Sequence, residues 1–413
     1  MRDVERQLLS CLAAYRLGKR TAKLENGFAD WAALRRLADA HKLSPIVCET
    51  LWRDPAFCGG DAELAAAWRR QTVLQAAGQA ARTQRLLALV QPLEEAGVRY
   101  AVVKGALCRE LYPRPDLRLS GDEDLLVDEA DAVRCAERFR ENGMQPVGGL
   151  PDGPVTHWLD RRTGLHVELH TALFSTRRVA DRLLNGCFHE ELKNTVFAPA
   201  AGGLLRAFPP TYHFLLLVCH ALKHFIAGGF GIRTLCDVVT YAERHKGEID
   251  RQTVYGWLER VDGRVFLDQV FAIGQQTLGF DPAQSGWPLC AAADTEDMLA
   301  DILEAGIYGQ STLSRRHSAG TVLRAAEQGS RRGALLRTAF PPAQELHGRY
   351  PLLKRAPALL PAVWLHRFGR YGLELLHGRR EGSSLRESVA LGKKRTEMMR
   401  KYGILPKGKK KNR

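Results

Sequence analysis

The chain has 413 residues, 45% of them apolar and 26% charged, so it can bury more than one core and we expect two or three domains. No uncharged stretch reaches the roughly 18 residues of a membrane span, and Met1–Arg6 lacks the apolar start of a signal peptide, so we expect a cytoplasmic protein without a transmembrane segment. Nine scattered cysteines, none in a Cys-x-x-Cys pair, indicate reduced thiols rather than disulfides or a zinc site.

The formal charge of +14 is concentrated at the C-terminus, where residues 381–413 hold eleven Lys or Arg and three Glu. The final Lys407–Arg413 has no apolar side chain with which to fold, so we predict that residues 381–413 form a basic, disordered tail. Such a tail could hold an anionic partner, namely RNA, an acidic protein or a lipid surface. It could equally be a solubilising terminus without a dedicated partner.

Residues 1–97 form the first predicted region, which is helical. Leucine and alanine at helical spacing predict helices over residues 4–17, 30–41 and 62–96. Asp30 and Asp61 are suited to cap the second and third of these, and Gly97 to end the third. We expect this region to pack against a sheet.

Residues 98–180 alternate short strands with helices. Strands are predicted over residues 100–103, 124–127, 155–160 and 165–170, with a helix over 129–142. This order favours an α+β fold in which a small mixed sheet is the core. Residues 181–380 are predicted to form a C-terminal helical domain.

Two carboxylates stand where the second strand begins. Side chains alternate across a strand, so Asp122 and Asp124 should share one face while Leu125 and Val127 are buried on the other. Paired carboxylates hold hard cations such as Mg²⁺ (or Mn²⁺) together with substrate phosphates. The ordinary alternative for an acidic triplet is a solvated turn before a core strand.

A third carboxylate stands in the strand over residues 165–170, where strict alternation places His166, Glu168 and His170 on one side. Glu168 is our candidate third metal ligand. The same three residues suggest a zinc hydrolase, but that interpretation leaves the Asp pair unexplained. A half-exposed strand whose polar face merely meets water is the simplest alternative.

Positive charge and a glycine precede the Asp pair. Gly105 would let backbone amides approach a phosphate closely, and a helix starting there would add partial positive charge. Lys104 and Arg118 could supply full charges.

A second group of polar side chains follows in the helical domain, where His220 and His224 lie at i and i+4 with Lys223 beside them. We expect Lys223 and His224 to face phosphate or acceptor, with a polar seam between helices as the alternative. Arg233 and Asp237, also at i and i+4, suggest an intrahelical ion pair, with a role in orienting a histidine as the alternative.

The ordered set of motifs resembles an uncharacterised bacterial nucleotidyltransferase family within the DNA polymerase β-like superfamily. The resemblance covers most of residues 30–370 and is carried by Lys104–Ala106, Leu111–Pro113, Arg118, Gly121–Val127 and His166–His170. Such enzymes have a glycine motif at a helix start, an Asp-x-Asp pair on the next strand and a third acid on a neighbouring strand. One departure is Ala106, where the superfamily usually has Ser or Gly.

The resemblance implies transfer of a nucleoside monophosphate from an NTP, with ATP the first candidate, to an acceptor hydroxyl or phosphate, releasing pyrophosphate. The acceptor, a small molecule, a protein or RNA, stays open. The alternative is a catalytically inactive binding module of the same fold, acting in a biosynthetic or RNA-related complex. The expected catalytic residues and metal ligands are Asp122, Asp124 and Glu168, and the expected nucleotide-binding residues are Lys104, Gly105, Arg118, Gly121, Lys223 and His224.

Overall fold

The computed structural model divides the chain into two compact units. The first is Met1–Lys223 with Gly231–Ile307, and the second is His224–Phe230 with Tyr308–Arg413. The boundaries predicted at residues 97 and 180 therefore fall inside the first unit, and the one at 380 inside the second. The structure describes residues 1–25, 27–148, 153–176, 178–288, 295–306, 340, 342–346, 350–354, 356–376 and 385–404.

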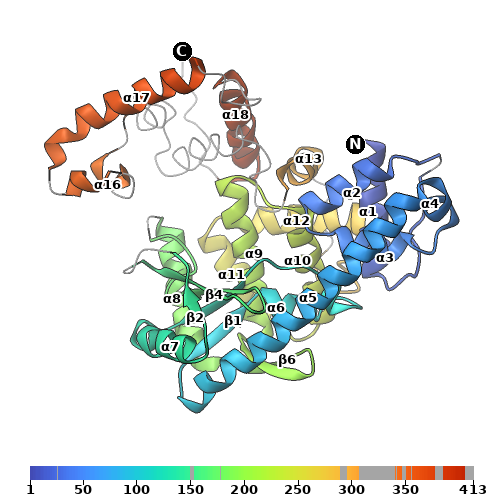
Figure 1. Cartoon of the computed structure of the whole chain (residues 1–413), viewed down its shortest axis with the longest axis horizontal. Coiled ribbons are helices and arrows are strands. Elements are labelled where there is room, and N and C mark those ends of the chain that lie inside the picture. Colours follow the sequence, from blue (N-terminus) through green and yellow to red (C-terminus); the bar gives the residue numbers. More distant parts are fainter. Residues whose placement is uncertain are drawn as a thin grey trace. The chain divides into compact units, whose positions relative to one another are not determined.

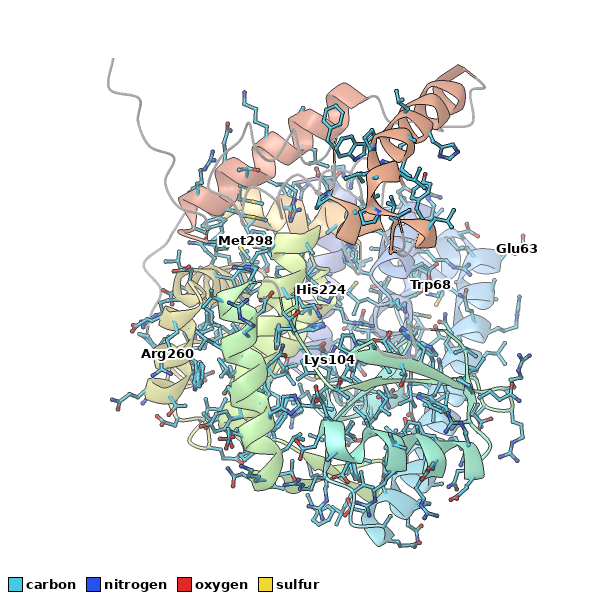
Figure 2. The ribbon with its side chains drawn as sticks, turned by 90° about the vertical axis from the view of Figure 1, so that its left-hand side faces the viewer. Glu63, Trp68, Lys104, His224, Arg260 and Met298 are labelled. Carbon is cyan, nitrogen blue, oxygen red and sulfur yellow. The ribbon has the colours of Figure 1, made fainter. Side chains whose placement is uncertain are left out.

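The N-terminal region is helical, as predicted. Asp30 and Asp61 cap their helices by accepting hydrogen bonds of 3.0 Å from the amides of Ala33 and Leu64. On the second of these helices Trp68 is fully buried, whereas Glu63, five residues earlier, is exposed (Figure 2). The helices are α1 (Asp3–Arg16), α2 (Trp31–Ala40), α3 (Ser44–Leu51), α4 (Pro55–Gly60) and α5 (Ala62–Glu95).

A five-stranded mixed sheet follows, in the order β1-β2-β5-β4-β3. Figure 1 labels three of its strands, β1, β2 and β4. Strands β2 and β5 run parallel, and the other neighbouring pairs are antiparallel. The strands are β1 (Tyr100–Val103), β2 (Glu123–Val127), β3 (Gln145–Pro146), β4 (Val155–Asp160) and β5 (Leu165–His170), with α6 (Gly105–Arg109), a 3-10 turn (Pro115–Leu117) and α7 (Glu129–Glu141) between them. The four predicted strands are confirmed, and β3 is too short to have been recognised.

The main core lies on one face of this sheet. Leu125 and Val127 belong to it, as predicted, together with Leu89 and Leu93 of α5 and Phe139 of α7. Because side chains alternate along β2, Asp124 points to the opposite face.

A β-hairpin, β6 (Val196–Ala200) and β7 (Gly203–Ala207), adds Leu205 and Ala207 to the same core. It lies within the region predicted to be a helical domain, so that prediction is wrong for these residues. Short apolar runs carry little periodicity, and the hairpin is stabilised by packing on the core.

Helices form most of the remaining described chain, and the fold is α+β. No helix among the described residues is long and apolar enough to cross a membrane. The first unit also contains α8 (Val179–Glu191), a 3-10 turn (Leu192–Asn194), α9 (Pro210–Ala227, which continues into the second unit), α10 (Ile232–Arg244), α11 (Arg251–Arg260), α12 (Arg264–Leu278) and α13 (Glu296–Ala305). The second contains α16 (Ala343–Leu346), 3-10 turns (Pro351–Lys354 and Pro357–Leu359), α17 (Leu360–Leu376) and α18 (Leu385–Lys401).

Helix α18 corrects the prediction of a disordered tail. Met399 and Tyr402 are buried, and the buried Arg395 guanidinium donates to the Phe225 carbonyl. These side chains anchor a segment that its charge alone suggested would be unfolded. The lysine-rich end after residue 404 lies outside the described residues, so the anionic partner remains a proposal for that end.

Candidate functional site

The three predicted metal ligands meet on one face of the sheet. Asp124 on β2 is the register partner of Glu168 on the parallel neighbour β5, and Asp122 immediately precedes β2. Ligand atoms of Asp122, His166 and Glu168 lie within 4.8 Å of one another, and so do those of Asp124, Glu168 and His170. The alternation read in each strand thus becomes one carboxylate cluster once β2 and β5 pair.

Strand β4 adds an imidazole that the sequence did not single out. His157 is the register partner of Glu168, and its Nδ1 lies 3.4 Å from Glu168 Oε1. Its ring also stacks on His166, with centroids 5.6 Å apart and an interplanar angle of 9°. The predicted strand contained His157, but nothing in the sequence indicated which strand it would pair with.

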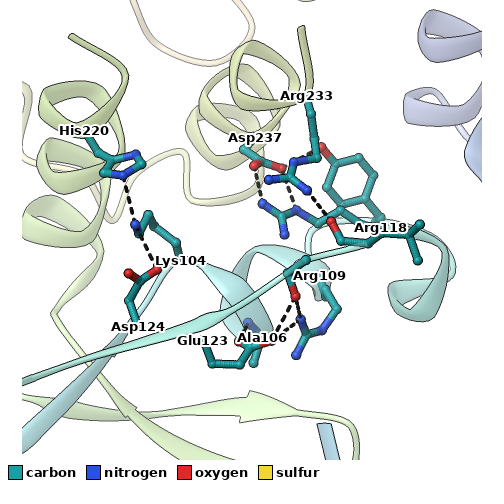
Figure 3. A network of polar contacts seen from close by, with 12 residues as sticks. Lys104, Ala106, Arg109, Arg118, Glu123, Asp124, His220, Arg233 and Asp237 are labelled. Atoms are coloured by element: carbon teal, nitrogen blue, oxygen red, sulfur yellow. Dashed lines mark hydrogen bonds and ion pairs between the residues drawn. The ribbon is translucent and has the colours of Figure 1, made fainter. Parts of the chain in front are cut away.

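Lys104 links the carboxylates to α9. Its Nζ lies 2.9 Å from Asp124 Oδ2 and 2.9 Å from His220 Nε2 (Figure 3). Its backbone has φ 63° and ψ −124°, an unfavourable conformation for a residue with a side chain. Such strain persists where surrounding contacts enforce it, and it gathers at functional sites.

The charges of the cluster are unevenly compensated. Burial opposes ionisation of Asp124, but Lys104 and His170 outweigh it and hold the pKa of Asp124 well below its ordinary value. The pKa of Asp122 is raised by burial and by the charge of Asp124. Asp124 is thus held ionised, whereas ionisation of Asp122 beside it is opposed. A bound cation would favour the ionised form of both acids.

Hydrogen bonding also ties Glu168 to His170. A hydrogen bond from His170 is the main cause that lowers the pKa of Glu168. Burial lowers the pKa of His170, but its bonds to Asp124 and Glu168 outweigh burial and raise it. His170 is buried, with Nε2 2.9 Å from Asp124 Oδ1 and 3.4 Å from Glu168 Oε2.

This donor set fits a divalent cation. Carboxylate oxygens from Asp122, Asp124 and Glu168 are the ligands that Mg²⁺ and Mn²⁺ accept, and Glu168 lies close enough to each aspartate to share an ion with it. The zinc-hydrolase set does not form a site of its own, because His166 and His170 fall into different clusters, each with one aspartate.

The glycine before the cluster has a structural reason. Gly105 has φ +30°, and a side chain there would collide with the carboxylate of Glu123. Glu123 Oε2 accepts the Ala106 amide at 2.7 Å, and Oε1 accepts bonds from Arg109 at 2.6 Å and Ser120 at 2.9 Å. The helix-start amide expected to face a phosphate is therefore taken by Glu123 (Figure 3).

Arg118 does not face the carboxylate cluster. It is buried, and two of its guanidinium nitrogens donate to the two oxygens of Asp237 (Figure 3). Asp237 also accepts the Tyr112 hydroxyl at 2.7 Å. Arg118 is thus held in a buried ion pair with Asp237, and its contact with a nucleotide stays a prediction. Sequence spacing had suggested Arg233 for Asp237, and the long-range partner carried no sequence signal.

The remaining predicted residues are placed as follows. A Cβ on Gly121 would lie 2.7 Å from Lys42 Nζ, so the glycine makes room for a lysine that the sequence did not single out. The charge of this lysine offsets part of the rise in the pKa of Asp122. Lys223 Nζ donates to the Leu173 carbonyl at 2.9 Å, and burial and then the charge of Lys104 lower its pKa. His224 belongs to the second unit.

Comparison with known proteins gives a family. A family model described as "Uncharacterised nucleotidyltransferase" matches residues 28–279. A solved structure of an antigenic nucleotidyltransferase-like protein from Paracoccidioides brasiliensis is similar at 15% identity and a TM-score of 0.32, over 48% of this chain and 93% of that one. No curated protein matches the chain.

Proposed function

Because the chain belongs to the uncharacterised nucleotidyltransferase family, we propose that it transfers a nucleoside monophosphate from an NTP to an acceptor and releases pyrophosphate. ATP is the first candidate donor, and the acceptor supplies a hydroxyl or phosphate. The observation that carries this proposal is the meeting of Asp122, Asp124 and Glu168 on one face of the sheet.

These three carboxylates would hold Mg²⁺ or Mn²⁺. When bound, such cations neutralise triphosphate charge and orient the attacking and leaving oxygens for in-line displacement at the α-phosphate. Asp124 is kept ionised by Lys104 and His170, so it is ready to bind a cation. Glu168 has a lowered pKa, which favours a ligand role over that of a general base.

Lysines surround the carboxylates and would bind the triphosphate. Lys104 is held in place by both the sheet and α9. The charges of Lys104, Asp124 and Glu168 act on the pKa of Lys223, so it lies near them. The charge of Asp122 acts on the pKa of Lys42 in the same way. Gly121 leaves room for the Lys42 ammonium group, and Gly105 leaves room for the Glu123 carboxylate.

The test is nucleotide transfer from each α-³²P-labelled NTP, with Mg²⁺ or Mn²⁺, into fractions of a cell extract. We expect one fraction to acquire label with the wild-type chain and to lose it with Asp122→Asn. Asp128→Asn is the matched control, because Asp128 follows the same strand but pairs with Arg99 outside the cluster. Equal labelling by wild type and Asp122→Asn contradicts the proposal, and nucleotide binding without any labelling would instead support the inactive binding module.

A further inference from the structure

The carboxylate cluster contains two overlapping groups of possible metal ligands, and each group includes one imidazole. One cluster is Asp122, His166 and Glu168, the other is Asp124, Glu168 and His170, and Glu168 is common to both. Each cluster therefore offers two carboxylate groups and one imidazole nitrogen. A carboxylate shared between two cation positions is suited to the paired-ion arrangement that serves phosphoryl chemistry.

The spacing around His170 suits coordination as well as hydrogen bonding. Two donor atoms on neighbouring corners of an octahedron with bonds of about 2.1 Å lie about 3.0 Å apart. His170 Nε2 lies 2.9 Å from Asp124 Oδ1 and 3.4 Å from Glu168 Oε2. Once Nε2 releases to solvent the proton that it donates to these carboxylates, its lone pair can bind a cation together with them, and the ring is buried.

His166 is held beside the other cluster. Its ring stacks face to face on His157, and His157 Nδ1 lies 3.4 Å from Glu168 Oε1. Stacking limits rotation of the half-exposed His166 ring, and the His157 contact steadies the shared carboxylate. Both imidazoles next to the acids are therefore oriented before any ion binds.

We propose that His166 and His170 are nitrogen ligands of the cations held by Asp122, Asp124 and Glu168, and that the chain therefore binds Mn²⁺ in preference to Mg²⁺. This inference rests on the proposed function for the carboxylate ligands. Mg²⁺ demands oxygen donors and near-ideal octahedral geometry, whereas first-row transition cations bind imidazole nitrogen as well as oxygen. A mixed oxygen and nitrogen donor set thus discriminates between two ions that a purely carboxylate site would accept alike.

The test is electron paramagnetic resonance of Mn²⁺ added to the metal-free full chain. Titration gives the Mn²⁺ affinity and its competition by Mg²⁺, and pulsed spectra show whether nitrogen is directly coordinated. We expect nitrogen coupling in the wild type and none in the double variant His166→Gln/His170→Gln, whose preference for Mn²⁺ over Mg²⁺ should fall at least about tenfold. His245→Gln is the matched control, since His245 also lies beside a glutamate, Glu248, at 3.2 Å.

The half-exposed His166 gives a variant that does not depend on the buried ring. In His166→Gln alone, nitrogen coupling should fall but persist, because His170 remains. Mn²⁺ bound without nitrogen coupling in the wild type, or an unchanged preference in the folded double variant, would overturn the inference.

The failures of the two proposals are distinguishable. Nitrogen-coordinated Mn²⁺ in a chain that labels no acceptor would support the inference and contradict the proposed function. Nucleotide transfer with a site that binds Mn²⁺ through oxygen alone would do the reverse.

Discussion

The two faces of strand β2 each carry an acid, and the two acids differ in their surroundings. Glu123 points to the core face, where its oxygens accept bonds from the Ala106 amide, Arg109 and Ser120. Asp124 points to the other face, where it meets Glu168 and stands close to Asp122. On the first face a single acid is enclosed by donors, whereas on the second Asp124 is paired with Lys104 and His170 but three acids share a small volume.

This difference suggests that Glu123 stabilises the fold, whereas Asp124 serves the proposed reaction. The buried pair of Glu123 and Arg109 holds the turn that carries Lys104, and it is closed to ligands. The cluster on the other face gathers three carboxylates, and the charge of Asp124 adds to burial in raising the pKa of Asp122. Mutation of Glu123 should therefore lower stability, whereas mutation of Asp124 should lower activity.

The largest expected effect is on the outer face. Asp124→Asn should lower nucleotide transfer at least about 10²–10³-fold, the scale of losing one charge-stabilising group in an active site. The variant also loses its ion pair with Lys104, so rates are compared under conditions in which the variant is folded. Initial rates with the labelled fraction, beside circular dichroism and the Asp128→Asn control, measure this. Wild-type rates in the variant would remove Asp124 from the catalytic set.

On the core face of β2, mutation should lower the free energy of unfolding. Glu123→Ala leaves Arg109 as a buried charge without its partner, which costs about 3–5 kcal/mol of unfolding free energy. Urea unfolding measures the loss, with Glu141→Ala as the control, because Glu141 makes an exposed pair with Arg138 and its loss should cost about 1 kcal/mol or less. An equal loss of unfolding free energy in the two variants would mean that the contacts of Glu123 with Arg109 and Ala106 do not stabilise the turn.

An intermediate effect is expected where the two faces connect. Lys104→Met removes the cation beside Asp124 while keeping a side chain of similar length. If Lys104 binds the triphosphate, the dissociation constant for NTP should rise about tenfold to a hundredfold, the range for one charge-assisted hydrogen bond. Calorimetric titration with a non-hydrolysable ATP analogue measures it, with the exposed Lys19→Met as control. An unchanged constant would reduce Lys104 to a structural partner of Asp124.

The smallest effect concerns pH. The pKa of His170 is raised in the fold, so its stabilisation is fully present below its ordinary value of 6.5 and is lost as pH rises through the folded value. In metal-free protein, the wild type should therefore lose unfolding free energy above pH 6.5 relative to His170→Gln. Urea unfolding in EDTA over this pH range tests it. Parallel pH profiles would show that His170 is not charged in the fold.

Sequence patterns predicted what is local and missed what is paired. Alternation placed Asp122 and Asp124 on one face and Glu168 on the polar side of its strand, but only pairing of β2 with β5 brings them together. The partners of Arg118 and Glu123 come from long-range contacts and turn geometry, which no spacing rule encodes. Net charge similarly suggested disorder where the buried residues of α18 give a helix.

The most direct measurement is a crystal structure of the chain with Mn²⁺ and a non-hydrolysable NTP analogue. Anomalous scattering should place Mn²⁺ about 2.1–2.3 Å from oxygens of Asp122, Asp124 and Glu168, with the α-phosphate on the same ion. Manganese and nucleotide bound together elsewhere, with these three carboxylates bare, would contradict the account.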